Sequence, residues 1–369
     1  MNAITHTDID RNPFKKRCVF WISCLFLFIS HLNTQSQPII QTIAQHHTKE
    51  TFYSTPIRTS SGVVVAASHH RQIRFFDASG NLINSYKTKC WIHATAAQLS
   101  DETVGICSYD KHLYFFSERG DFLEKIKFKG RIFTNPVELG GNLVFGCNKR
   151  LAFYDRTTKE ISYLHLKGLV HGSPMITSDS MLVVGSNGKC LYFINADREI
   201  VYTFRTKGWI MHSKPCETFD GQIVFGSYDR HLYAVDRSGN LLWKYKTKGR
   251  IHGSPIQMPD RSIVFGSFDG NVYILSAEGT LINKVKTGKK VVASPAVVND
   301  SLFVIGSYDK NLYFITSKGE PVATYKAEGK IFSSPVVLSD GMVFVCTTNG
   351  RIYFIAGQMI CMSTIISYL

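Results

Sequence analysis

GRIHGSPIQMPDRSIVFGSFDGNVYILSAEGTLINKVKTG, residues 249–288, contains four short runs of strand-forming residues separated by Pro-Asp, Asp-Gly and Glu-Gly turns. These runs predict four β-strands, A to D in chain order: Arg250–Met258, Ser262–Phe268, Val272–Leu275 and Thr280–Lys286. Strand C is apolar on both faces, so it has to be covered from both sides. The stretch therefore predicts a small sheet that lies between two others.

The same pattern recurs along the chain. The proline of the Ser-Pro pair, or an alanine in the second copy, is found at Pro56, Ala96, Pro136, Pro174, Pro215, Pro255, Pro295 and Pro335. The steps between these positions are 40, 40, 38, 41, 40, 40 and 40 residues. A second marker follows in each copy, at Ala67, Cys107, Gly146, Gly185, Gly226, Gly266, Gly306 and Cys346. Four-stranded units repeated at this period are typical of a β-propeller, so we predict an all-β, eight-bladed propeller of four-stranded antiparallel blades.

The eighth copy has strands A, B and C but no evident strand D. Residues Pro38–Ala44 precede the first strand A and could complete this blade, and the tail Gly357–Leu369 is the alternative. The tail lacks the Gly turn and the Lys-Thr-Lys ending of the other D strands. We therefore expect the N-terminal strand to close the ring, with a propeller at 37–357 and a C-terminal tail at 358–369.

The fifth copy carries the sequence Gly226-Ser-Tyr-Asp-Arg-His-Leu-Tyr-Ala-Val-Asp236-Arg-Ser-Gly239-Asn-Leu-Leu-Trp243. It resembles the PQQ-like, or quinoprotein-type, propeller repeat, whose hallmark is an Ala-x-Asp…Gly-x-x-x-Trp motif. The resemblance implies that Asp236, Gly239 and Trp243 dock one blade against the next. In the other copies, we assign the tryptophan position to Tyr86, Ile126, Phe204, Val285 and Tyr325.

Two branches of that family suggest different functions. In the enzymatic branch the resemblance implies pyrroloquinoline quinone and calcium in a central funnel, together with adjacent cysteines and long inserted loops. This chain has no adjacent cysteines, and its repeats leave almost no residues for insertions. The non-enzymatic branch includes an outer-membrane assembly lipoprotein of similar size and architecture. We therefore expect a non-catalytic scaffold with no cofactor and no metal, and keep a quinone- or metal-dependent oxidoreductase as the alternative.

The N-terminus predicts export. Residues Cys18–Ser30 form an apolar run too short to span a bilayer, preceded by Lys15-Lys16-Arg17, and Thr34 and Ser36 are suited to cleavage before Gln37. Residues 1–36 are thus predicted to be a secretory signal, or a signal-anchor if cleavage does not occur. The protein is expected in the periplasm or outside the cell, as a monomer. The cysteines downstream show no metal-site or disulfide spacing, so we interpret them as small buried hydrophobic residues.

The formal charge of +14 is unevenly distributed. In a four-stranded meander, the B–C turns and the D-to-A crossings share one face, and this face collects basic residues. Those we expect to bind anions are Lys87, Lys89, Lys127, Lys129, Lys207, Lys246, Lys248 and Arg250. The alternative is that these lysines only solvate strand ends and were copied by duplication. Export and the lack of any recognition motif argue against nucleic acid, which leaves a protein, an acidic glycan or an anionic envelope surface as partner.

Four histidines hold the same repeat position, three residues before the proline: His93, His171, His212 and His252. They are predicted to lie at the mouth of the central channel, where they could bind an anion, bind a metal or simply pack the inner rim. Two imidazolium ions about 8 Å apart repel by about 2 kcal/mol at an effective dielectric of about 20. We therefore expect neutral histidines at pH 7, and tighter binding of an anionic ligand as the pH falls through about 6.

Overall fold

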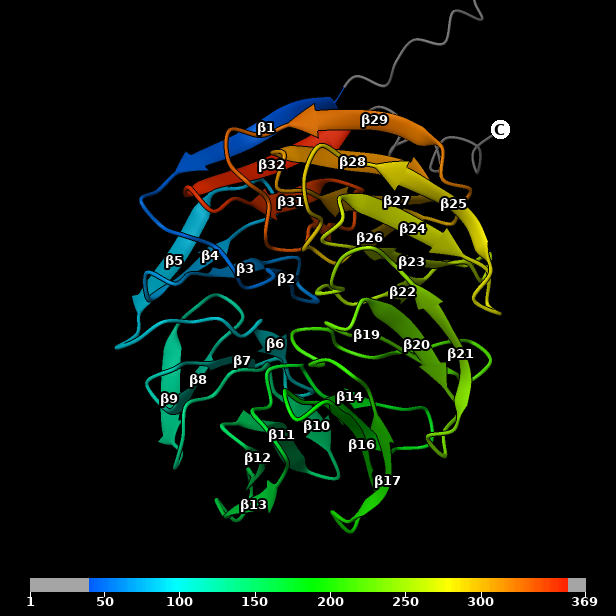
Figure 1. Cartoon of the computed structure of the whole chain (residues 1–369). Coiled ribbons are helices and arrows are strands. Elements are labelled where there is room, and N and C mark those ends of the chain that lie inside the picture. Colours follow the sequence, from blue (N-terminus) through cyan, green and yellow to red (C-terminus); the bar gives the residue numbers. More distant parts are fainter. Residues whose placement is uncertain (1–39, 358–369) are drawn as a thin grey trace, which may run out of the picture. The chain divides into compact units, whose positions relative to one another are not determined.

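Each copy of the repeat forms one four-stranded antiparallel sheet, and the eight sheets are arranged as an eight-bladed β-propeller (Figure 1). The structure, a computed structural model, describes residues 40–357, so the predicted signal at 1–36 and the tail at 358–369 lie outside it. The described residues contain strands and turns and no helix, hence none that could span a membrane. The predicted fold class is confirmed.

Each blade is built in the same order, from an innermost strand A to an outermost strand D. Blades 1 and 2 contain β2 (Ile57–Arg58), β3 (Val64–Ala67), β4 (Gln72–Phe76), β5 (Leu82–Lys87), β6 (Ala97–Gln98), β7 (Val104–Cys107), β8 (His112–Phe116) and β9 (Phe122–Lys127). Blades 3 and 4 contain β10 (Val137–Leu139), β11 (Asn142–Cys147), β12 (Arg150–Asp155), β13 (Ile161–His165), β14 (Met175–Ile176), β15 (Leu182–Gly185), β16 (Cys190–Ile194) and β17 (Ile200–Arg205).

The second half of the ring follows the same order. Blades 5 and 6 contain β18 (Cys216–Glu217), β19 (Ile223–Gly226), β20 (His231–Val235), β21 (Leu241–Lys246), β22 (Ile256–Gln257), β23 (Ile263–Gly266), β24 (Asn271–Leu275) and β25 (Leu281–Lys286). Blades 7 and 8 contain β26 (Ala296–Asn299), β27 (Leu302–Gly306), β28 (Asn311–Thr316), β29 (Pro321–Lys326), β30 (Val336–Val337), β31 (Val343–Cys346), β32 (Arg351–Gly357) and β1 (Ile40–His47).

Strand β1 closes the ring by pairing antiparallel with β32, as the sequence predicts. The pairing runs from Ile40 opposite Gly357 to His47 opposite Arg351, with one bulge after Thr42. The N-terminal strand thus becomes strand D of the last blade (Figure 1).

The buried side chains form eight separate clusters, and each cluster lies between two neighbouring blades. Between blades 5 and 6, for example, Val224 and Leu232 pack against Phe265 and Tyr273. Phe76 of blade 1 packs against Phe344 and Phe354 of blade 8, which completes the circle. Strand C is apolar on both faces because each of its faces belongs to a different cluster.

Two details of the predicted blade are wrong. The sequence predicts strand A at Arg250–Met258, but β22 comprises only Ile256–Gln257. The preceding residues turn in toward the axis, where their backbone bonds to side chains of neighbouring blades. Ser254 N, for example, donates to Ser294 Oγ at 2.8 Å, and Ser294 N donates to Ser334 Oγ at 2.9 Å.

The second error concerns the docking position. Trp243 pairs with Ala234 across the sheet, and the equivalent pairs elsewhere involve Asn84, Glu124, Tyr202, Asn283 and Ala323. The residues assigned from sequence lie two positions further along strand D, so they do not occupy the tryptophan position. Strand alternation explains the error, because apolar residues two apart share one face of a strand.

Candidate functional site

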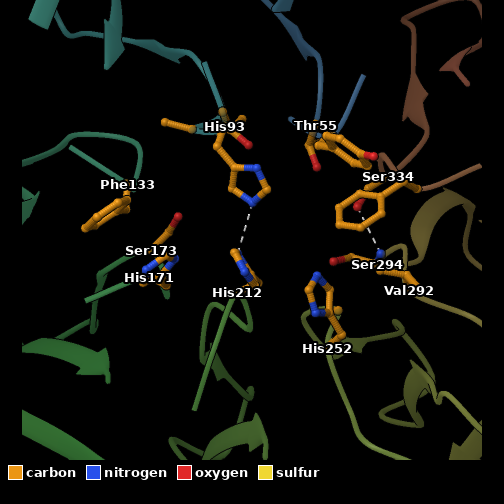
Figure 2. Close-up of a pocket in the computed structure, with 15 residues that line it drawn as sticks. Thr55, His93, Phe133, His171, Ser173, His212, His252, Val292, Ser294 and Ser334 are labelled. Carbon is orange, nitrogen blue, oxygen red and sulfur yellow. Dashed lines mark hydrogen bonds between the residues drawn. The ribbon is translucent and has the colours of Figure 1, made fainter. Parts of the chain in front are cut away.

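The four predicted histidines meet at the centre of the ring. Their side chains line a cavity of about 80 Å³, together with Tyr53, Phe133 and Phe332 (Figure 2). His93 Nε2 lies 3.3 Å from His212 Nδ1, although the two residues come from blades 2 and 5. The rings of His171 and His252 lie 5.4 Å and 4.5 Å from that of His212. The structure therefore brings together four side chains that the sequence scatters over four blades.

His212 reaches this position through a local change in the backbone. Its copy of the repeat is one residue longer than the usual 40, and His212 adopts a φ of 63°. Few residues other than glycine take this left-handed conformation. The turn accommodates the extra residue and keeps Lys214 in register with blade 6, because Lys214 N donates to Ser254 Oγ at 2.9 Å.

A fifth histidine, His69, joins the cluster without having been predicted. Its Nε2 lies 2.8 Å from His93 Nδ1, and its ring stacks on Trp91 with centroids 5.5 Å apart. The available signal was the B–C turn of blade 1, which reads Ser-His-His-Arg where blade 2 has Ser-Tyr-Asp-Lys. The contacts from His93 through His69 to Trp91 thus lead from the central cavity to an exposed side chain.

Burial keeps the cluster neutral at pH 7. Burial lowers the pKa of His93 to about 3, with smaller contributions from His69, His252 and His171. It lowers the pKa of His252 to about 3 and those of His171 and His69 to about 4. The pKa of His212 is also well below its usual value, first through burial and then through the neighbouring histidines.

The neutral state was expected from sequence, but its main cause is desolvation rather than repulsion between imidazolium ions. Because the pKa values of His69, His93, His171 and His252 are near 3 to 4, these four side chains gain no proton as the pH falls through 6. This differs from the sequence-based expectation that protonation would draw in an anion near pH 6.

The cavity does not fit pyrroloquinoline quinone and calcium. None of the fifteen residues lining it is acidic, whereas calcium takes oxygen ligands, commonly from carboxylates. Its volume is also below the roughly 300–1,000 Å³ of pockets for larger organic ligands. Within residues 40–357, no group of three or more His, Cys, Asp or Glu side chains could hold a metal ion. His171 Nδ1 is buried without a hydrogen-bond partner.

The second candidate site is a surface that we call the crossing face, made of the D-to-A crossings and the B–C turns. Backbone hydrogen bonds join the two kinds of segment: Tyr109 N donates to Trp91 O at 2.9 Å, and Tyr228 N donates to Trp209 O at 2.8 Å. The A–B and C–D turns emerge at the other ends of the strands, and we call that side the turn face.

Carboxylates on the crossing face are held by hydrogen bonds within the blades. Asp229 Oδ2 accepts from Lys207 N and from the hydroxyl of Tyr233, both at 2.9 Å. Asp269 Oδ2 accepts in the same way from the backbone of blade 5 and from its own blade's tyrosine. The same arrangement recurs at Asp110 and Asp309. These carboxylates thus join the D-to-A crossings to the B–C turns by accepting hydrogen bonds from backbone N–H groups, and not by pairing with lysine ammonium groups.

The predicted basic residues remain unpaired on this face. All eight, from Lys87 to Arg250, are exposed, and none takes part in an ion pair within the described part of the chain. Arg250 lies over the ring of Tyr228, at 5.2 Å from its centroid. On the turn face, by contrast, ion pairs join neighbouring blades, at Arg156–Asp101, Arg261–Asp220 and Lys318–Asp260.

Of the docking residues predicted from the motif, Trp243 and Gly239 contact neighbouring blades, whereas Asp236 bonds within its own turn. Trp243 Nε1 donates to Ala277 O of blade 6 at 2.9 Å, and its ring covers Gly279. Asp236 Oδ1 accepts from Asn240 N at 2.8 Å, which fixes the C–D turn. Gly239, with a φ of +77°, lies next to Tyr202 of blade 4.

Comparisons with known proteins agree with this geometry. Residues 268–358 match the PQQ_2 family model, described as outer membrane protein assembly factor BamB. Over these residues the repeats match those of a PQQ-like propeller. Residues 181–296 also match a lambda-carrageenase β-propeller domain.

Among solved structures, BamB from Moraxella catarrhalis is similar to this propeller, with a TM-score of 0.72 and 12% sequence identity. The match covers 86% of this chain and 97% of that one, and at this identity it shows the fold alone. No curated protein matches the chain.

Proposed function

We propose that this protein is an exported, non-catalytic scaffold of the cell envelope that binds an acidic segment of a partner protein through its crossing face. The observation that supports this proposal best is that basic side chains form ion pairs differently on the two faces of the propeller. Basic side chains on the turn face are used in ion pairs between blades, whereas the eight predicted on the crossing face are exposed and unpaired within residues 40–357. An unpaired basic surface attracts anionic partners and speeds their encounter.

The comparisons support the same class of function. The matching family model is described as an outer membrane protein assembly factor, and the assembly of proteins requires contact with them. The likeness to a lambda-carrageenase propeller gives no reason to propose polysaccharide cleavage, because most glycoside hydrolases use a pair of carboxyl groups. The central cavity has no acidic residue in its lining.

The test is salt-sensitive retention of the purified propeller on an envelope fraction. Replacing Lys246, Lys248 and Arg250 with glutamate should reduce retention at least tenfold at physiological salt, because all three lie in one crossing or at the strand end next to it. The matched control changes Lys125, Lys244 and Lys284 to glutamate, which alters the net charge equally but at the middle of three D strands. Equal losses in both triple variants would show that net charge, and not the crossing face, governs retention.

A further inference from the structure

Blade 1 departs from a hydrogen-bonding pattern that four other blades share on the crossing face. In blades 2, 5, 6 and 7, the B–C turn carries an aspartate that accepts from a tyrosine four residues later. In blade 1 these two positions are His70 and Arg74. His70 Nδ1 accepts from Thr51 N at 3.0 Å, and Arg74 Nε donates to Glu50 Oε1 at 3.0 Å. One rim carboxylate is therefore lost, and a guanidinium group is gained.

The residues that replace the aspartate and the tyrosine in blade 1 line two hollows on the surface. One, of about 490 Å³, lies between blades 8 and 1 and is lined by residues that include His47, Lys49, Gln72 and Lys87. The other, of about 510 Å³, lies between blades 1 and 2 and is lined by residues that include Thr51, Lys89 and Trp91. His70 and Arg71 line both, so the hollows adjoin at the B–C turn of blade 1.

The charge of this double hollow is strongly positive. Its lining contains five basic side chains, at Lys49, Arg71, Arg74, Lys87 and Lys89, and one carboxylate. That carboxylate, Glu50, is buried and bonded to Arg74, and its Oε2 has no partner. The other four basic side chains are exposed and make no ion pair within residues 40–357. The site can therefore bind several anionic groups spaced along one ligand.

Aromatic and neutral polar groups narrow the ligand class. Trp91 is 54% exposed, and it is held flat against His69 at an interplanar angle of 8°. A fixed indole face carries negative π density, so it attracts the polarised C–H groups on the face of a sugar ring. Thr48, Thr51 and Gln72 add uncharged hydrogen-bonding groups suited to hydroxyls. Cations, one flat aromatic platform and neutral polar groups together match a polyhydroxylated, negatively charged chain.

We propose that the double hollow at blades 8, 1 and 2 is a binding site for an anionic saccharide, with Trp91 as the stacking platform and Arg71 as the central anion ligand. The site is separate from the crossing between blades 5 and 6 on which the proposed protein docking is tested. Either proposal can therefore fail without the other.

The experiment is calorimetric titration of the propeller with four probes at physiological salt. The probes are a sulfated tetrasaccharide, a polygalacturonate tetramer, neutral cellotetraose and adenosine monophosphate. We expect binding of one or both anionic tetrasaccharides, at least tenfold tighter than that of the other two probes, and the tighter of the two identifies sulfate or carboxylate as the preferred group. Failure of both anionic tetrasaccharides to bind, or tighter binding of the nucleotide, would overturn the proposal.

Matched variants locate the site. Trp91→Ala and Arg71→Asn should each weaken saccharide binding at least tenfold. Trp209→Ala and Arg230→Asn change the same positions in the blade 4–5 region, where the turn keeps Asp229, and should change affinity less than twofold. Asparagine is chosen because Arg71 and Arg230 both have positive φ, 68° and 73°. Equal losses in both pairs would mean diffuse attraction to the whole face and would reject the site.

Discussion

At the scale of single residues, contacts between blades depend on glycines that leave space for a neighbour. A Cβ at Gly279 would lie 2.5 Å from the ring of Trp243, which is itself fixed by hydrogen bonds to Ala277 O and Gln222 Oε1. Gly279 also has a φ of +80°. Gly62 has a similar φ of +88°, but nothing lies within 4 Å of the place its Cβ would take.

Comparing these two glycines separates the free energy lost by placing a side chain at positive φ from the free energy lost by a clash with Trp243. We expect Gly62→Ala to lower the free energy of unfolding by about 1 kcal/mol, the cost of an L-residue at positive φ. Gly279→Ala should lower it by about 2–4 kcal/mol, because the tryptophan has to move as well. Urea unfolding of both variants measures the difference. Equal losses would mean that Trp243 contributes little to the docking of blades 5 and 6.

At the scale of elements, ring closure depends on one strand that comes from the far end of the sequence. Without β1, strand β32 would become an open edge, and apolar side chains such as Phe354 would lose part of their cover. We expect a chain that lacks residues 1–47 to melt about 5 °C or more below one that begins at residue 38, as measured by circular dichroism. A synthetic peptide of residues 38–48, added in excess, should restore part of the loss.

Removal of residues 358–369 serves as the control for this experiment. Because β1 already occupies the strand D position of blade 8, this deletion should leave the melting temperature unchanged. A larger effect from the C-terminal deletion than from the N-terminal one would contradict closure of the ring by β1.

The elements also show what could be predicted from the sequence. The period of the repeat, the four strands of each blade and the closing strand followed from local patterns of turns and apolar residues, which the fold preserves. The length of strand A could not be predicted, because residues such as Ser254 bond to neighbouring blades and not within a ladder. The close packing of the histidines could not be predicted either, because it depends on the positive φ of His212 and on a contact with His69 of another blade.

At the scale of the whole molecule, the histidine cluster links stability to pH. The unfolded chain binds a proton at each histidine below about pH 6.5, whereas the folded chain keeps His93 and His252 neutral down to about pH 3. Unfolding therefore takes up protons, and stability is lost as the pH falls below 6.5. Each such histidine should lower the free energy of unfolding by about 2 kcal/mol between pH 7 and pH 5.

The variant His252→Phe tests this linkage. Phenylalanine occupies the same repeat position at Phe133 and Phe332, so the ring can be replaced by one of similar size. Denaturant unfolding at pH 7 and pH 5 should show that the variant loses about 2 kcal/mol less than the wild type over this interval. An unchanged difference between the two pH values would mean that His252 is protonated in the folded state as well.

The antiparallel pairing of β1 with β32 also determines how the propeller responds to force. Ile40 lies opposite Gly357, so the chain enters and leaves the ring at the same end of one strand pair. A pull applied between these two residues would load the hydrogen bonds one after another, from this end toward His47, in an unzipping geometry and not in shear. The pairing that closes the ring is therefore also its weakest point under force. Tension between Ile40 and Gly357 would separate β1 from β32 and open blade 8 before it strained any other blade.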